Sequence, residues 1–298
     1  MVVMLRNLII IAVALCMIPF ASAAQEVNIG AYVLNVGKYE LATGSYTIDF
    51  YLSIKCDQKC DPNIEFMNGR ATSLEKIIDK PNDKFYRIQA SLQEQVNLES
   101  FPFDEQKLTI LIEDKEKPID DFIFIPNADE AGLDPAVKFV GWQIQGWQHN
   151  TTIHNYEVYD EQYSQYQFEI TIGRSPFNAV LKTLLPVFFI VLITLFSFII
   201  DPDKITNRLT LVTSSLVAAV MFHVNIANQL PPVGYLTFAD KFMVLTYVVL
   251  LFSLATSIVL LELSERKDER VTKIHRATEY TGFIVVPLMY VLLFVFGL

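Results

Sequence analysis

The sequence predicts a chain in two parts: a β-sandwich of about ten strands with immunoglobulin-like architecture, followed by a bundle of four membrane-spanning helices. Apolar and polar residues alternate with a period of two before residue 176, which is typical of strands with one buried face. Four long apolar segments follow, each long enough to cross a bilayer as a helix. In all, 52% of the 298 residues are hydrophobic, which is more than an ordinary soluble domain carries.

Residues 1–23 are typical of a secretory signal peptide. Arg6 gives a positive start, residues 8–20 form an apolar core, and Ala21-Ser22-Ala23 is a small-residue cleavage site. The apolar run is short for a complete span, and a retained anchor is the alternative. We therefore expect the mature chain to begin outside the cytoplasm.

Residues 24–176 are expected to form the sandwich. Apolar residues alternate with mostly polar neighbours in three runs, at 46–54, 108–112 and 166–172. Such alternation places one strand face on a core and the other in water. Turn-forming residues such as Thr43-Gly44 separate the runs. Several short strands at this spacing predict two packed sheets.

Charge separates along the chain. Residues 24–180 carry 25 acidic and 13 basic side chains, a net charge of −12, whereas the residues from 181 onward carry a net charge of +1. An acidic outer domain disfavours nucleic acid as a partner and concentrates cations near its surface. Simple solubility explains the same pattern, so charge alone does not choose between these interpretations.

Cys56 and Cys60 are the two cysteines that remain once residues 1–23 are removed. In an oxidising compartment we expect a disulfide that closes a short loop, with free thiols as the alternative. A metal site would need two further ligands, and no zinc pattern lies nearby. We expect no metal and no cofactor.

Residues 177–298 are expected to form the membrane domain, with spans near 181–200, 206–228, 239–261 and 278–298. With the N-terminus outside, four spans return the C-terminus to the same side. Basic residues then gather in the two links that face the cytoplasm, as the positive-inside rule requires. They are Lys204, Arg208, Arg266, Lys267, Arg270, Lys273 and Arg276. We expect a multi-pass protein of the cell (inner) membrane with both termini on the extracytoplasmic side.

The second span carries a stripe of residues with polar ends and an apolar middle. Spacings of four and three residues place these side chains on one helical face: Thr210, Ser214, Val217, Met221, Val224 and Asn228. Five such helices around an axis would line a pore, in which hydroxyls replace water around an ion and an apolar ring blocks it by dewetting. The alternative is helix packing, in which hydroxylated residues lie at interfaces or bond to their own backbone.

Two ionisable residues of this span leave alternatives open. Arg208 stands at the inner mouth and favours anions unless it points away from the axis, whereas the acidic outer domain favours monovalent cations as the permeant ions. His223 falls off the stripe, and we expect a packed neutral histidine, with a proton sensor as the alternative.

Phe101-Pro102-Phe103-Asp104-Glu105-Gln106 lies between two predicted strands. Such an aromatic-flanked turn is able to press an apolar plug onto the membrane domain, and its proline is a candidate for a cis peptide bond. Placed before four spans, the motif closely resembles the signature loop of the pentameric ligand-gated ion channels, the Cys-loop receptor superfamily. The resemblance runs across nearly the whole mature chain.

Other segments resemble the same family. They are Arg174 before the first span, Pro186 within it, Leu230-Pro231 after the second, residues 60–68 around the first ligand-binding loop, and Gly141-Trp142-Gln143-Ile144 before the ligand-capping loop. Cys60 stands where the family usually has a tryptophan. The cysteines of animal receptors fall on Glu94 and Leu108, so the family's disulfide is missing. That absence and the short inner linker resemble the bacterial branch.

The resemblance implies a homopentameric ring of identical subunits in a lipid membrane. It also implies a gating interface between the two domains. The residues of that interface are Glu40, Phe101, Pro102, Phe103, Asp104, Arg174, Pro231 and Tyr235. We expect Glu40, Asp104 and Arg174 to form a charged cluster there.

Ligand capture is implied at extracellular subunit interfaces, beneath a capping loop. Candidate ligand-binding residues are Glu65, Phe66, Tyr156, Tyr159 and Tyr163. Aromatic faces of this kind attract a cation. The alternative is that alternate tyrosines face the sandwich core, as Tyr166 is expected to do by strand parity. An unknown small molecule or protons would act as the agonist.

Two other classes of protein explain less of the sequence. An enzyme would need a nucleophile, base and acid or a cluster of metal ligands, and the sequence suggests neither. A membrane-anchored sensor or adhesion module needs only one span and leaves the stripe unused. We therefore predict a ligand-gated or pH-gated, cation-conducting channel subunit that is not an enzyme.

Overall fold

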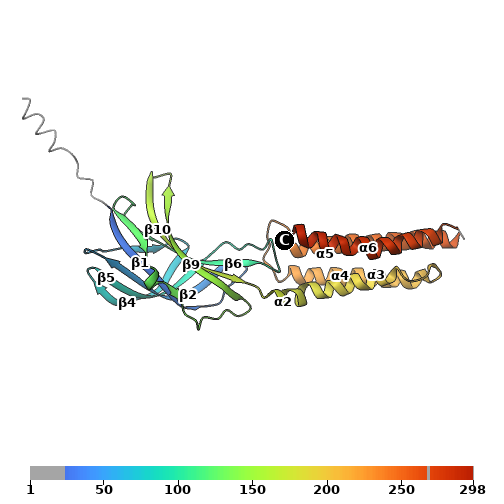
Figure 1. The fold of residues 1–298 in the computed structure, drawn as a ribbon, viewed down its shortest axis with the longest axis horizontal. Coiled ribbons are helices and arrows are strands. Elements are labelled where there is room, and N and C mark those ends of the chain that lie inside the picture. Colours follow the sequence, from blue (N-terminus) through green and yellow to red (C-terminus); the bar gives the residue numbers. More distant parts are fainter. Residues whose placement is uncertain (1–23, 267–268, 298) are drawn as a thin grey trace, which may run out of the picture.

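The computed structural model describes residues 24–266 and 269–297, with a β domain at one end and a helical bundle at the other (Figure 1). The predicted signal peptide, residues 1–23, lies outside the described residues. The two parts join where strand β10 (Glu161–Gly173) leads into the first helix.

Ten strands form the β domain in two sheets. The six-stranded sheet has the order β4-β5-β2-β1-β7, with β8 paired to β1. Its strands are β1 (Gln25–Val36), β2 (Ser45–Cys56), β4 (Gly69–Lys80), β5 (Asp83–Gln93), β7 (Phe122–Pro126) and β8 (Gly132–Leu133). The four-stranded sheet has the order β3-β6-β10-β9. Its other strands are β3 (Ile64–Phe66), β6 (Glu105–Asp114) and β9 (Gln143–Tyr156).

One apolar core lies between the two sheets, as the alternation of residues predicts. Successive side chains of a strand point to opposite faces, so every second residue of β2 and β10 is buried. Phe50 and Phe168 are fully buried there. Tyr166 also faces the core, where its hydroxyl accepts a hydrogen bond from the Ala31 N–H at 3.2 Å. The core therefore fixes which faces of β9 and β10 remain for binding.

Four long apolar helices follow the β domain and could each cross a membrane. The first is built from α2 (Pro176–Ala179), a π-helical turn (Val180–Leu184) and α3 (Leu185–Ser197). The others are α4 (Ile205–Ala227), α5 (Phe238–Glu265) and α6 (Val271–Gly297). The first helix begins at Pro176 rather than at 181, because residues 176–180 continue it toward the β domain. The last begins at Val271 rather than at 278, because the mostly polar residues 271–277 continue the helix beyond its apolar run.

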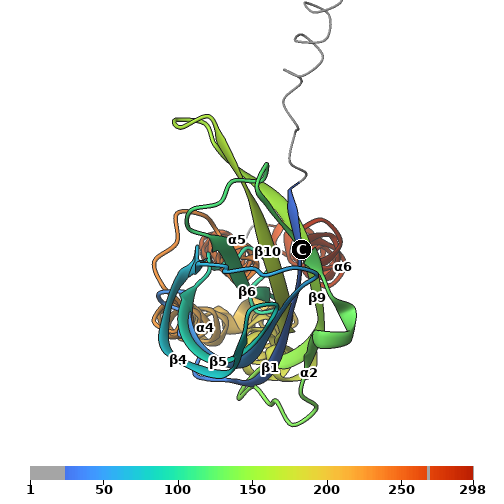
Figure 2. The same ribbon diagram turned by 90° about the vertical axis from the view of Figure 1, so that its left-hand side faces the viewer.

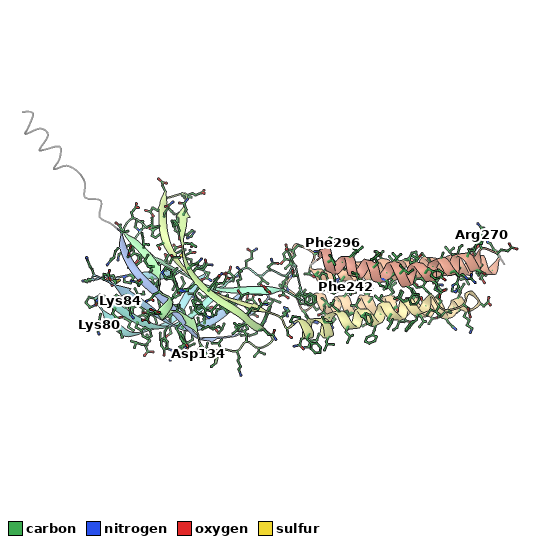
Figure 3. All side chains as sticks on the ribbon, in the orientation of Figure 1. Lys80, Lys84, Asp134, Phe242, Arg270 and Phe296 are labelled. Atoms are coloured by element: carbon green, nitrogen blue, oxygen red, sulfur yellow. A yellow bond between two sulfur atoms is a disulfide. The ribbon has the colours of Figure 1, made fainter. Side chains whose placement is uncertain are left out.

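The end of α6 lies beside the β domain, so the bundle begins and ends on the same side (Figure 1). Lys241, near the start of α5, donates from Nζ to the Gly297 carbonyl at 3.2 Å. Figure 3 places Phe242 and Phe296 near the β domain and Arg270 at the far end of the bundle. Within the β domain, the tip of the β9–β10 hairpin projects sideways beyond the rest of the sandwich (Figure 2).

Candidate functional site

The loop between β5 and β6, residues 94–104, enters the end of the helical bundle. The N–H groups of Phe238 and Ala239, the first residues of α5, donate to the carbonyls of Glu99 and Phe101 at 2.8 and 3.0 Å. The first N–H groups of a helix have no partner within the helix. The loop therefore supplies the missing acceptors and caps α5.

The same loop presents an apolar plug to the bundle. Phe101 is buried in a small cluster that includes Ile226 of α4. Phe103 packs edge-on against Phe238 and Phe294, with ring centroids 6.0 and 6.4 Å apart. The plug therefore touches the helix that carries the polar stripe and the two helices behind it.

The link between α4 and α5 also contacts the loop. Tyr235 accepts a hydrogen bond at its hydroxyl from the Leu98 N–H at 2.8 Å. Pro231 is half-buried and lines a cavity of 840 Å³ together with Leu41 of the β1–β2 turn. Pro102 is buried, and its peptide bond to the preceding residue is cis.

Arg174 connects the end of β10 to this loop. Its Nε donates to Oδ1 of Asp104 at 2.6 Å; the Asp104 side chain is 1% exposed and that of Arg174 is 26% exposed. The guanidinium carbon lies 5.0 Å from the ring centroid of Phe101 and 4.5 Å from that of Trp142. Glu40 is exposed and makes no ion pair with Arg174 among the described residues. The structure thus brings together two of the three expected charges.

All six residues of the stripe on α4 are exposed in the single subunit. The apolar middle of the stripe is open: Val217, Met221 and Val224 are 60%, 70% and 54% exposed. The opposite face of the helix, which includes Val212 and Ala219, is buried against the other helices. The stripe therefore points away from the subunit's own bundle.

The hydroxyl of Thr210, at the start of the stripe, bonds to its own helix. It donates to the Thr206 carbonyl at 2.9 Å, which is the backbone bond expected of a hydroxyl in a membrane helix. Such a hydroxyl still offers oxygen lone pairs to water or to a cation. Asn228, at the C-terminal end of the stripe, is also exposed.

Arg208 points away from the stripe. Its side chain is 1% exposed, Nη2 donates to the Thr256 hydroxyl at 3.3 Å, and the guanidinium carbon lies 4.9 Å from the Phe198 ring centroid. Position 208 falls on the same helical face as the buried Val212, so the cation lies between α4 and its neighbours. No positive charge therefore stands on the stripe.

His223 joins α4 to α5 off the stripe. Its Nδ1 lies 3.0 Å from the Tyr247 hydroxyl and its Nε2 lies 3.3 Å from Oδ1 of Asp240. One carboxylate and one hydroxyl thus satisfy both ring nitrogens. The histidine is half-buried, and these two contacts hold its ring between α4 and α5, away from the stripe.

Four of the five candidate ligand residues line an open cavity of 240 Å³ near the tip of the β9–β10 hairpin. Its lining residues are Glu65, Glu113, Asp114, Lys115, Tyr156, Tyr159, Glu161 and Tyr163. Phe66 is the exception, because it packs edge-on against Phe50 of the core with ring centroids 6.2 Å apart. Adjacent residues of a strand face opposite sides, so Glu65 and Phe66 cannot both face the cavity.

A buried carboxylate forms the base of this cavity. Glu113 is 1% exposed and accepts hydrogen bonds from the Tyr156 hydroxyl at 3.0 Å and from Gln165 at 2.6 Å. His154 Nδ1 lies 2.6 Å from the same carboxylate. Burial and the hydrogen bond to Glu113 raise the pKa of Tyr156 to about 12, so this hydroxyl stays protonated. Tyr163 packs edge-on against Tyr156 at 5.5 Å.

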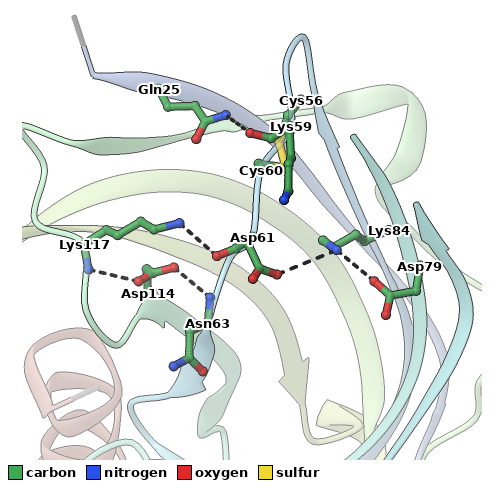
Figure 4. Close-up of a disulfide and its surroundings, with 10 residues drawn as sticks. All are labelled: Gln25, Cys56, Lys59, Cys60, Asp61, Asn63, Asp79, Lys84, Asp114 and Lys117. Atoms are coloured by element: carbon green, nitrogen blue, oxygen red, sulfur yellow. Dashed lines mark hydrogen bonds and ion pairs between the residues drawn. A yellow bond between two sulfur atoms is a disulfide. The ribbon is translucent and has the colours of Figure 1, made fainter. Parts of the chain in front are cut away.

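Cys56 and Cys60 form a disulfide at the end of β2, just before the segment that carries Glu65 (Figure 4). Beyond it, Lys117 donates to the Asp61 carbonyl at 2.8 Å and Asp114 accepts from the Asn63 N–H at 2.8 Å (Figure 4). The disulfide and these bonds together hold the segment against β6, which places Glu65 in the cavity.

Known proteins resemble parts of this chain. Residues 183–282 match the family described as the neurotransmitter-gated ion-channel transmembrane region. A proton-gated ion channel of Gloeobacter violaceus is 23% identical over 193 residues, which cover 63% of this chain and 53% of the relative. The human 5-hydroxytryptamine receptor 3B is 28% identical over 169 residues, covering 55% and 37%. The rat neuronal acetylcholine receptor subunit alpha-10 is 24% identical over 168 residues, covering 56% and 37%.

The membrane-spanning part of this chain is thus similar to the transmembrane region of the neurotransmitter-gated ion-channel family. This is a family of ion channels and not of enzymes. The chain spans about half the length of the first of these relatives and less of the others.

A hydrogen bond joins the two ends of the loop between β5 and β6. The Glu94 carboxylate accepts it from the Thr109 hydroxyl of β6. Glu94 and Leu108, the neighbour of Thr109, are the positions that the resemblance predicts to correspond to the two loop cysteines of animal receptors. Burial and the charge of Glu169 raise the pKa of Glu94.

Sequence reasoning did not single out Glu113 or the contact of Trp142 with Arg174. Glu113 lies on the polar side of a strand pattern, where an acid is ordinarily solvated, and its burial depends on partners in β9 and β10. Trp142 had a weak signal, because it lies in a segment that resembles the family. Neither contact follows from spacing along the chain.

Proposed function

We propose that the chain is one subunit of a homopentameric channel of the cell (inner) membrane, opened by a small molecule or by protons. The observation that carries the proposal is the exposed face of α4, which bears Thr210, Ser214 and an apolar middle and turns away from the subunit's own helices. Lipid gives such hydroxyls no partner, whereas a water-filled axis shared by five copies does.

The stripe divides into two working parts. Thr210 and Ser214 would line the narrow inner end, where hydroxyl oxygens replace part of the water around an ion. Val217, Met221 and Val224 would form an apolar ring that blocks the closed channel by dewetting. Opening then requires only a tilt or rotation of α4 that widens or hydrates this ring.

Monovalent cations are the proposed permeant ions. The region 24–180, which would stand above the pore, carries a net charge of −12 and raises the local concentration of cations. Arg208 does not oppose this, since its guanidinium lies between helices.

An organic cation fits the cavity at the hairpin tip better than an anion does. Four carboxylates and one lysine line it, beside three tyrosines. An ammonium group over a tyrosine face gains about 0.5–2 kcal/mol, and nearby carboxylates add to this attraction. Relatives named as 5-hydroxytryptamine and acetylcholine receptor proteins support a small-molecule agonist, and the relative named as proton-gated supports protons as the second candidate.

The proposed orientation places the β domain and both termini on the extracytoplasmic side. The bundle begins and ends beside the β domain, and basic residues such as Arg266 and Arg276 lie toward its far end. The missing loop disulfide and the short link between α5 and α6 support the bacterial branch of the family.

Recordings from purified protein in planar bilayers test the proposal, with pH steps and a panel of primary and quaternary amines as stimuli. With a KCl gradient across the bilayer, we expect currents that reverse near the equilibrium potential of the cation and not near that of chloride. Single cysteines along residues 206–228 should let a thiol reagent block the current at 210, 214, 217 and 221. Uniform reactivity along α4, or a purified protein that is monomeric by mass photometry, would refute the proposed pore.

A further inference from the structure

The two strands that carry the cavity lined by Glu65, Tyr156 and Tyr163 at one end approach the loop of residues 94–104, here called the gating loop, at the other. β9 and β10 pair along their length, from Glu161 opposite Tyr156 at the tip to Gly173 opposite Gln143 at the junction. The next residues in the same register are Arg174 and Trp142. The hairpin therefore delivers an arginine and a tryptophan to the same place by the rule of antiparallel pairing.

A tight turn fixes the approach of Trp142 to the hairpin. Its N–H donates to the Phe139 carbonyl at 3.3 Å, and Gly141 has a φ of +86°. A turn of this type needs a residue at positive φ in its third position, which glycine adopts without strain. The side chain of Val140 in this turn is 98% exposed. The turn therefore packs little itself, and it serves to lead the chain into β9.

The ring of Trp142 and the ring of Phe101 both lie against the guanidinium of Arg174, at 4.5 and 5.0 Å. Tyr39 packs edge-on against Trp142 at 5.8 Å and supports it from the other sheet. Arg174 is at the same time bonded to the buried Asp104 of the loop. Trp142 and Arg174 thus both extend from the hairpin, and the guanidinium is the group through which the hairpin contacts Phe101 and Asp104 of the gating loop.

We propose that Trp142 is a positioning residue for gating: its ring holds the Arg174 guanidinium against Phe101 and Asp104, so that a displacement of the hairpin moves the gating loop. This inference rests on the proposed channel function. The contact is electrostatic, between a cation and the negative face of an indole. It therefore depends on the electron density of the ring and not only on its size.

The chain has two tryptophans, which permits a direct test. A Trp147→Phe variant has Trp142 as its single tryptophan, so biosynthetic replacement with mono-, di- and trifluorotryptophan labels that position alone. The control is Trp142→Phe, in which the same analogues label Trp147, a ring stacked on Phe168 at 5.4 Å with no cation over it among the described contacts. Each fluorine weakens a cation–π contact and leaves the shape of the ring nearly unchanged.

Two measurements are made on both series, each with and without Arg174→Gln. The first is the melting temperature of the purified protein, and the second is the midpoint of the current evoked by pH steps or amines. We expect the midpoint to shift stepwise with fluorination of Trp142, by about 2- to 30-fold across the series. Fluorination of Trp147 should leave the midpoint unchanged, and the melting temperature should depend on fluorination of Trp142 only when residue 174 is arginine.

The possible failures are distinguishable. If the Trp147→Phe protein gives currents whose midpoint does not change with fluorination of Trp142, this inference alone is overturned. A melting series that is the same with arginine and glutamine at position 174 also overturns it, because the contact then contributes nothing. Absence of current from every variant and from the unmodified chain overturns the proposed function, and the coupling role with it.

Discussion

Replacing Arg174 with alanine should strip a buried carboxylate of its charged partner. The side chain of Asp104 is 1% exposed and has one other side-chain bond, from Gln106 at 3.0 Å. At 2.6 Å and an effective dielectric of about 20, the gross attraction in the pair is about 6 kcal/mol. Removing one member of a buried pair costs about 3–5 kcal/mol, and the partial exposure of Arg174 places this pair near the lower value.

A loss of about 3 kcal/mol should lower the melting temperature of the β domain by about 6–12 °C. The assay is thermal melting of the purified protein in detergent, followed by near-UV circular dichroism. Adding Asp104→Asn to Arg174→Ala removes the orphaned charge and should recover a large part of the loss. The matched control is Arg87→Ala, because Arg87 pairs with Asp49 on the exposed face of the same domain and should cost about 0.2–1 kcal/mol.

Two results would refute this reasoning. Arg174→Ala could have the same melting temperature as the control variant, which would mean that water already screens the pair. The double variant could be no more stable than Arg174→Ala, which would mean that the loss comes from packing against Phe101 and Trp142 rather than from an unpaired carboxylate. Normal currents from Arg174→Ala would in addition remove this residue from gating.

Three further predictions concern other parts of the chain. Glu94 has a raised pKa, so its stabilising contribution is full below about pH 4.5 and is lost as the pH rises through its pKa in the folded protein. Glu94→Gln should therefore become more stable than the parent protein toward neutral pH. Melting temperatures of the two proteins that change in parallel with pH would contradict this. Replacing Cys56 and Cys60 with serine should cost about 2 kcal/mol for so short a closed loop, and reductant should then have no further effect on melting. His223→Phe should lower the free energy of unfolding by about 1–3 kcal/mol, since it removes two hydrogen bonds between α4 and α5 and keeps a ring. An equal loss in Asp240→Asn, with no further loss in the double variant, would show that both substitutions remove the same hydrogen bond.

The parts of the structure that follow from periodicity could be predicted from the sequence. Alternation in β2 and β10 identifies the buried faces, because a strand has only two of them. The spacing of Thr210 and Ser214 identifies one face of α4 in the same way. Two further placements follow from the same periodicity. Arg208 lies on the same helical face as Val212, and Phe66 faces the opposite side of its strand from Glu65.

The contacts that depend on pairing between distant segments could not be predicted. Glu113 becomes the base of a cavity only because β10 and β9 bring Gln165 and His154 beside it. The charged cluster at the junction was expected to include Glu40, whose carboxylate lies in solvent in the described structure, since the β1–β2 turn brings Leu41 rather than Glu40 against the loop. The spacing of residues along the sequence carries no information on distances between segments that lie far apart in the chain, whereas the register of paired strands does.

The capping of α5 by the gating loop determines how the junction can move. If the loop withdrew while α5 stayed in place, the N–H groups of Phe238 and Ala239 would lose their acceptors within an apolar site. Each buried, unpaired donor costs about 1–3 kcal/mol, so the pair would cost about 2–6 kcal/mol. That range includes the ~5.5 kcal/mol that moves a two-state equilibrium from 1:99 to 99:1.

Separation of loop and helix would thus cost up to about as much as such a shift requires, and we expect the loop and the start of α5 to move as one body. Hydrogen exchange measured with and without an activating stimulus tests this expectation. The amides of Phe238 and Ala239 should remain as protected as the interior of α5 in both conditions. Faster exchange on activation would mean that the loop leaves the helix, and that the signal reaches α4 through the Tyr235 link instead.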